Sequence, residues 1–151
     1  MTDSATRRAL HLWVVLNRAQ AAVAAHASRD AAEHDLTLAE FGALEALFHK
    51  GPMQVGMLQR KILISSGGIT FLVDRLIDRG LVERRPSAED RRARVVALTP
   101  EGEQLMATIF PVHAARVRHA LSGVSATTQR DLTDGLRALG LSAEQLLATD
   151  D

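Results

Sequence analysis

Residues 66–98 read SGGITFLVDRLIDRGLVERRPSAEDRRARVVAL, and the fold class can be inferred from this segment. From residue 66 to 79 the apolar side chains recur at helical spacing, at Ile69, Leu72, Val73, Leu76 and Ile77. That spacing predicts an amphipathic helix, which Gly80 ends. Two short candidate strands, 81–85 and 94–98, then flank a polar segment that Pro86 opens. This pattern predicts a β-hairpin with a charged turn.

A second short helix is expected just before this stretch. After Pro52, Val55, Leu58 and Ile62 fall at helical spacing, and the break at residues 63–66 separates them from the next helical run. Two helices joined by a tight turn and followed by a hairpin are typical of a winged helix-turn-helix, whose second helix enters the DNA major groove. The predicted fold class is therefore mainly α with a small two-stranded β wing.

Longer helices are expected on both sides of this module. Thr37 and Glu40 form a capping box for a helix over about 38–49, and Thr99-Pro100-Glu101 is a strong helix start. We expect one domain over residues 1–151, with a DNA-binding part at 37–98. The remaining helices would form a dimerisation part at 1–36 and 99–151, with a long first helix at about 7–32, a kink at Pro111 and a last helix after Ser125.

Charge is unevenly distributed although the formal net charge is zero. Residues 46–94 contain ten basic and five acidic residues, a surplus of five positive charges, whereas the rest of the chain contains eight basic and thirteen acidic residues. A basic middle between acidic flanks indicates that the middle meets a polyanion.

Several function classes are disfavoured by the sequence. There is no cysteine, so disulfides, thiolate metal sites and a cysteine nucleophile are excluded. No Gly-rich phosphate loop, Ser/His/Asp grouping or clustered carboxylate pair indicates an enzyme. His113 and His119 are the nearest approach to a metal site, but no acid pair completes it, and we expect no metal and no cofactor. No apolar run approaches the roughly 18 residues of a membrane span, and we expect a cytoplasmic protein.

Candidate DNA contacts lie first on the helix at 66–79. At its N-terminus free backbone amides can bind phosphate, beside Ser65, Ser66, Gly67 and Gly68. Further along, Thr70 could offer a hydroxyl or a methyl to a base edge, Phe71 could touch a thymine methyl, and Arg75 could contact guanine or phosphate. The alternative is that Phe71 packs on a neighbour and Arg75 is merely solvated.

The turn of the hairpin supplies the other candidates. Arg91, Arg92 and Arg94 lie within four positions, and an arginine at such a tip can enter the narrow minor groove. Asp90 is interpreted as a carboxylate that orients a neighbouring arginine. The alternative is a solvated surface hairpin.

The segment from Leu36 to Gly102 resembles the MarR family of bacterial transcriptional regulators. The resemblance rests on five pieces in order: Leu36-Thr37 with Phe41, Ile69-Thr70 with Val73-Asp74-Arg75-Leu76, Gly80-Leu81-Val82, Glu89-Asp90-Arg91-Arg92, and Leu98-Thr99-Pro100-Glu101-Gly102. It departs from many relatives at Gly67-Gly68, where they carry bulkier polar residues, so base contacts cannot be copied from a relative.

The resemblance implies a homodimer in which the first helix and the last two form the interface, with effectors in the crevice between that interface and the winged helix. The apolar stripes on the flanking helices also favour a dimer, because a monomer would expose them and monomers rarely tolerate apolar surface of that extent. These stripes contain Trp13, Leu105, Ile109, Leu132, Leu136 and Leu139. A two-fold dimer would read a pseudo-palindrome, with recognition helices about 34 Å apart.

A small aromatic or anionic effector is a further expectation. His11, Trp13 and Asn17 could line a crevice with Phe41, Met53 and a winged-helix arginine. The favoured alternative is that Trp13 is a dimer-core residue.

Together these features predict a sequence-specific DNA-binding regulator, a repressor relieved by a small molecule, with double-stranded DNA and a second copy of the chain as partners. Two other readings remain open: a winged helix used for protein contact, and a constitutive DNA binder without an effector.

Overall fold

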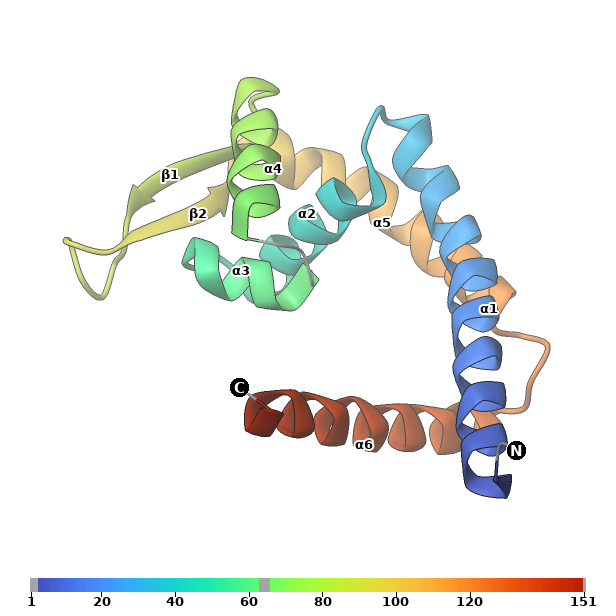
Figure 1. The fold of residues 1–151 in the computed structure, drawn as a ribbon. Coiled ribbons are helices and arrows are strands. Elements are labelled where there is room, and N and C mark those ends of the chain that lie inside the picture. The colour runs from blue at the N-terminus through green and yellow to red at the C-terminus, as the bar shows by residue number, and fades with distance from the viewer. Residues whose placement is uncertain (1–2, 63–65, 151) are drawn as a thin grey trace.

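The computed structural model describes residues 3–62 and 66–150, which form six helices and one two-stranded sheet (Figure 1). The elements are α1 (Ser4–Glu33), α2 (Leu38–Lys50), α3 (Val55–Ile62), α4 (Ser66–Asp78), β1 (Val82–Pro86), β2 (Arg94–Leu98), α5 (Pro100–Ala120) and α6 (Ala126–Asp150). The order and type of these elements follow the predicted winged helix-turn-helix between flanking helices. None of the helices in the described ranges is long and apolar enough to cross a membrane.

The helix starts are fixed by side-chain caps. The Asp3 carboxylate accepts a hydrogen bond from the Thr6 amide at 2.7 Å, so α1 begins slightly earlier than its apolar pattern predicts. At α2 the predicted capping box is present: the Glu40 amide donates to Thr37 Oγ1 at 3.1 Å, and the Thr37 amide donates to Glu40 Oε2 at 2.8 Å.

The core lies where α2, α3, α4, the sheet and α5 meet. From α4, Ile69, Leu72, Val73 and Leu76 are buried, as their helical spacing predicts. They pack in one cluster with apolar side chains of the neighbouring elements, among them Phe41, Leu44, Leu58, Val82, Val96 and Met106. Because this cluster uses one side of α4, the opposite side of the helix is left for solvent or a partner.

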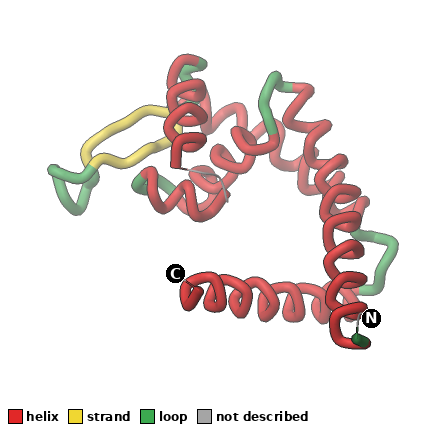
Figure 2. The backbone as a smooth tube through the Cα atoms, viewed as in Figure 1, coloured by secondary structure: helices red, strands yellow, loops and turns green. Residues whose placement is uncertain are grey.

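The wing is the antiparallel pair of β1 and β2, in register from Val82 opposite Leu98 to Pro86 opposite Arg94 (Figure 2). Met53, between α2 and α3, extends it by a bridge to Val96, with backbone hydrogen bonds of 3.1 Å and 2.9 Å. This bridge anchors the base of the wing to the helix-turn-helix.

The two arms of the molecule lie away from this core. α5 begins at a cap in which Thr99 Oγ1 accepts from the Gly102 amide, and it continues through Pro111, so the proline does not end the helix. The C-terminal half of α1 packs on α5, whereas the N-terminal half of α1 and all of α6 project from the body (Figure 1). Every side chain described from Arg130 to Thr149 is exposed.

Candidate DNA interface and effector groove

The outer face of α4 presents the residues that the sequence predicts for base contacts. Thr70, Phe71 and Arg75 are all exposed, and 66% of Phe71 is accessible, so its ring does not pack into the protein. Gly67 faces open space, since a Cβ added there would meet nothing within 4 Å, and Gly68 is partly exposed. Ser65 and the side chain of Ser66 lie outside the described residues.

Arg75 is not merely solvated, because two neighbours hold it. Its Nε lies 3.1 Å from Oε1 of Glu40, a carboxylate buried at the start of α2. Its guanidinium carbon lies 5.9 Å from the centre of the Phe71 ring, within the range of a cation–π contact.

Two further arginines fix α4 to the rest of the module. Arg84 on β1 pairs with Asp74 on α4 at 2.9 Å. Arg79, just after α4, donates to the backbone carbonyls of Asp35 at 2.6 Å and His34 at 2.9 Å, in the loop between α1 and α2. No sequence pattern indicates the Arg79 contacts, because their acceptors are backbone groups more than forty residues away.

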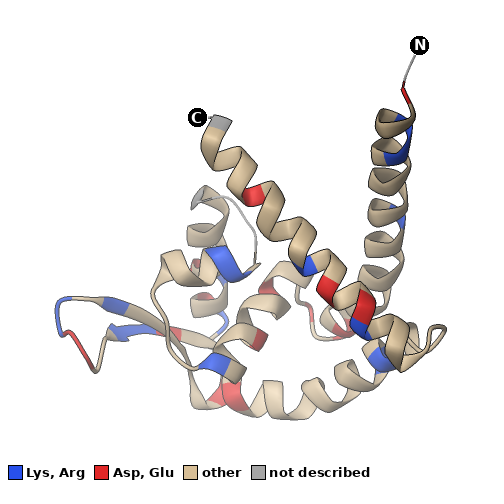
Figure 3. Ribbon diagram, turned by 90° about the horizontal axis from the view of Figure 1, so that it is seen from below, with Lys and Arg blue, Asp and Glu red and all other residues tan. Residues whose placement is uncertain are grey.

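The wing carries its arginines at an exposed tip (Figure 3). Arg91, Arg92 and Arg94 are all exposed. The structure corrects the interpretation of Asp90: its Oδ1 accepts from the backbone amide of Arg92 at 2.9 Å, and the described residues show no ion pair between Asp90 and a guanidinium. In a tight turn the nearest donors to an aspartate are the amides that follow it, and these compete well with a flexible side chain. Asp90 therefore orients the backbone of the tip.

A groove of about 770 Å³ opens between α1, α2, α3 and α5. Its floor is apolar and aromatic, with Phe41 against His113 at a centroid distance of 4.5 Å, and its polar lining includes Glu45, His49, Lys50 and Lys61. The size is within the usual range for a small-molecule site, and the lysines and histidines suit an anion.

The effector residues predicted from the sequence are not brought together in this chain. Phe41 lines the groove, but Met53 lines a separate hollow beneath the wing. His11, Trp13 and Asn17 lie on the exposed N-terminal half of α1 and line neither. Helical spacing can indicate which residues of α1 lie on one side of that helix. It does not indicate which other element packs against that side.

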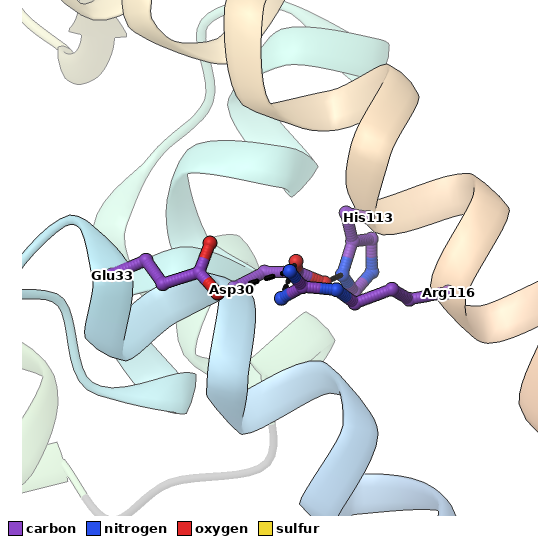
Figure 4. Close-up of polar contacts among 4 residues, drawn as sticks. All are labelled: Asp30, Glu33, His113 and Arg116. Carbon is purple, nitrogen blue, oxygen red and sulfur yellow. Dashed lines mark hydrogen bonds and ion pairs between the residues drawn. The ribbon is translucent and has the colours of Figure 1, made fainter.

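A buried polar cluster next to the groove was also missed by sequence reasoning (Figure 4). Asp30 on α1 accepts from Arg116 at 2.5 Å and lies 3.1 Å from Nδ1 of His113, both on α5. Arg116 also binds Glu33 at 2.9 Å. The cluster ties α1 to α5, and the ring of its His113 contacts Phe41. Among residues 3–62 and 66–150 no group of three or more His, Asp or Glu side chains is arranged to hold a metal ion.

Comparisons with known proteins agree with this arrangement. Residues 34–93 match the model of the MarR family. Over 140 residues the chain is 36% identical to the HTH-type transcriptional regulator MhqR of Bacillus subtilis (strain 168), covering 93% of this chain and 97% of that protein.

Two solved structures share the fold. Sco3205, a MarR family regulator from Streptomyces coelicolor solved in complex with DNA, superposes with a TM-score of 0.80 at 20% identity, over 95% of this chain and 94% of the other. BpsR of Bordetella bronchiseptica, whose DNA binding is regulated by 6-hydroxynicotinic acid, superposes with a TM-score of 0.73 at 24% identity, over 83% and 90%. Because the matches combine this fold with a full-length relative, the chain belongs to the MarR family of transcriptional regulators, which are non-enzymatic DNA-binding proteins.

Proposed function

We propose that this chain is a homodimeric repressor that reads a pseudo-palindromic operator and releases it when a small aromatic anion occupies the groove between α1, α2, α3 and α5. The observation that carries the proposal is the exposed face of α4, with Thr70, Phe71 and Arg75, beside an arginine-tipped wing. A helix of this kind fits the major groove and a basic tip fits the minor groove. That Sco3205, which shares this fold, was solved in complex with DNA supports a DNA-binding role.

The homodimer is supported by unburied apolar surface on the two arms. Leu132, Leu136 and Leu139 share one face of α6 and are 40–50% exposed, and Trp13 on α1 is 64% exposed. Ile109 on α5, expected in the same stripes, is instead buried in the core of the single chain. Stripes of the size that remains are rare on a monomer, and a two-fold partner would cover them.

The effector is supported by the chemistry of the groove. Phe41 and His113 offer flat surfaces for a ring, while Lys50 and Lys61 offer charge to a carboxylate or phenolate. That BpsR responds to a hydroxylated aromatic acid is consistent with a ligand of this class.

Relief of repression requires the groove to be coupled to α4, and α2 is the element that they share. Residues of α2 line the groove, while Glu40 on the same helix holds Arg75. Arg79 also attaches the end of α4 to the loop before α2. A ligand that shifts α2 would therefore shift the recognition helix, and it favours the dimer geometry that binds it best.

The DNA-binding function is tested by sequencing the fragments of genomic DNA that the purified protein retains and measuring their affinity at several salt concentrations. We expect tight binding that weakens steeply with salt, because phosphate contacts release counterions. Arg91→Ala and Arg92→Ala should weaken binding to all sequences, whereas Thr70→Ala and Arg75→Ala should change sequence preference. If all four variants bind like the wild type while remaining folded, the DNA-facing surface has been misassigned, and a winged helix used for protein contact becomes the better explanation.

The effector is tested by thermal shift across a panel of aromatic carboxylates. A ligand bound only by the folded protein must raise its melting temperature, by an amount that grows with ligand concentration. Lys61→Gln should reduce that shift, whereas Arg60→Gln, which removes one positive charge beside the groove without lining it, should not. A protein that responds to no member of the panel and whose operator binding none of them weakens would be a constitutive DNA binder.

A further inference from the structure

The environment of Glu40 is unusual for a carboxylate. It is 2% exposed, and within the described residues only Oε2 accepts a hydrogen bond, whereas Oε1 is in ion-pair contact alone. Oε2 accepts from the Thr37 amide as part of the capping box, and Oε1 lies 3.1 Å from Nε of Arg75. A capping box needs only an oxygen acceptor at this position, which glutamine supplies equally well. The cap alone therefore does not require the negative charge of Glu40.

Arg75 is held through the nitrogen that base recognition does not need. Glu40 pairs with Nε, which leaves Nη1 and Nη2 at the exposed end of the side chain; within residues 3–62 and 66–150 they have no acceptor. Paired terminal nitrogens of this kind match the O6 and N7 acceptors of guanine in the major groove. An arginine fixed in place also loses less side-chain entropy when it binds.

Phe71 completes the arrangement one helical turn before Arg75. Residues four apart lie side by side on a helix, and the guanidinium is 5.9 Å from the ring centre. An aromatic ring that is 66% exposed offers no hydrogen bond to a base, but it can contact the methyl group of thymine.

We propose that Glu40 is a positioning residue for DNA recognition, which locks Arg75 to read a guanine while Phe71 contacts a thymine methyl at a neighbouring position. We name these three side chains the Glu40–Arg75–Phe71 unit. The inference rests on the proposed operator-binding function, and it adds a residue of α2 that does not itself touch DNA.

The test uses Glu40→Gln in the full-length protein. Glutamine keeps an acceptor for the Thr37 amide but loses the charge that holds Arg75. The matched control is Glu144→Gln on α6, which makes the same change of net charge at an exposed position away from α4. Arg75→Lys keeps a positive charge at an exposed position but lacks the two-pronged guanidinium.

The measurement is the affinity for the selected operator and for versions changed base by base. Arg75→Lys should lose roughly 5- to 150-fold of the discrimination for guanine at one position in each half-site. Glu40→Gln should lose about tenfold at that same position, with affinity for random duplex and melting temperature close to those of Glu144→Gln. In an Arg75→Lys background Glu40→Gln should have no further effect on discrimination, because the two residues act as one unit.

Three results would overturn the inference. In the first, Glu40→Gln leaves the guanine preference intact; in the second, it weakens every sequence equally along with stability, as a purely structural role would. In the third, its effect on discrimination persists in the Arg75→Lys background. A wild-type protein that selects no sequence at all would overturn the operator-binding function, and this inference with it.

Discussion

Asp90 determines the shape of the wing tip at the scale of a single residue. Its side chain accepts from the Arg92 amide, and its own carbonyl accepts from the Ala93 amide, so the turn closes on itself. We expect Asp90→Ala to loosen this turn and weaken DNA binding by about fivefold, because each arginine must then be ordered on binding. Asp90→Asn should bind almost like the wild type, since the amide oxygen can accept the same hydrogen bond. If Asp90→Asn loses as much affinity as Asp90→Ala, the hydrogen bond to the Arg92 amide is not what sets DNA binding at this residue.

Gly102 is required by close packing between α5 and the start of the wing. A Cβ there would overlap the carbonyl oxygen of Leu81, which also accepts from the Thr99 amide. Backbone cannot move aside as a flexible side chain can, so Gly102→Ala should lower the free energy of unfolding by about 2–3 kcal/mol. Gly56→Ala in α3 is the control, because nothing lies within 4 Å of its added Cβ and alanine favours a helix. Chemical denaturation of the two variants measures the difference, and similar stabilities would contradict the packing argument.

The helices α1 and α5 are held together by the polar cluster around Asp30. Asp30 is buried and binds both His113 and Arg116, whereas Glu33 binds the same Arg116 from an exposed position. Asp30→Ala should reduce stability by about 2–3 kcal/mol, because His113 and the buried side of Arg116 lose their acceptor. Glu33→Ala should cost less than about 1 kcal/mol, as exposed ion pairs do. Unfolding by urea compares the two, and a larger loss for Glu33→Ala would mean that burial does not decide the strength of this cluster.

Helices and their caps could be predicted because they depend on residues close together in the sequence. The side-chain contacts between elements could not be predicted. The apolar spacing of α4 predicted both its buried side and the exposure of Thr70, Phe71 and Arg75, and the Thr37–Glu40 box predicted the start of α2. The partners of Arg75 and Asp30 could not be read in this way, because helical periodicity says which side of a helix is buried but not what lies across from it. For the same reason the sequence did not indicate that Phe41 and Met53 would line different hollows of the single chain.

The whole molecule has a packed centre and two apolar arms. The N-terminal half of α1 and the length of α6 leave the body in the views of Figures 1 and 3. Most of their leucines, with Trp13, remain exposed although the module has a buried core of its own. An arrangement of this kind is expected when the arms of a second copy supply the missing partner surface, so the spacing of the two recognition helices would be set far from the DNA.

Substitution on α6 tests this expectation directly. In a two-fold dimer Leu136→Asp removes a buried leucine twice and adds a buried charge twice, so the dimer dissociation constant should rise by roughly two orders of magnitude or more. Gln145→Asp, on the opposite side of α6 and also exposed, should leave assembly unchanged. Light scattering coupled to size exclusion gives the oligomeric state, and circular dichroism checks that the helices remain. The Leu136→Asp monomer should bind a single half-site weakly and lose its preference for two half-sites at one fixed spacing. The reason is that the DNA-binding parts of two chains are then no longer held together, so the second chain must bind from bulk solution. A wild-type protein that is monomeric at micromolar concentration, or a Leu136→Asp variant that still selects paired half-sites, would place the dimer contact elsewhere on the molecule.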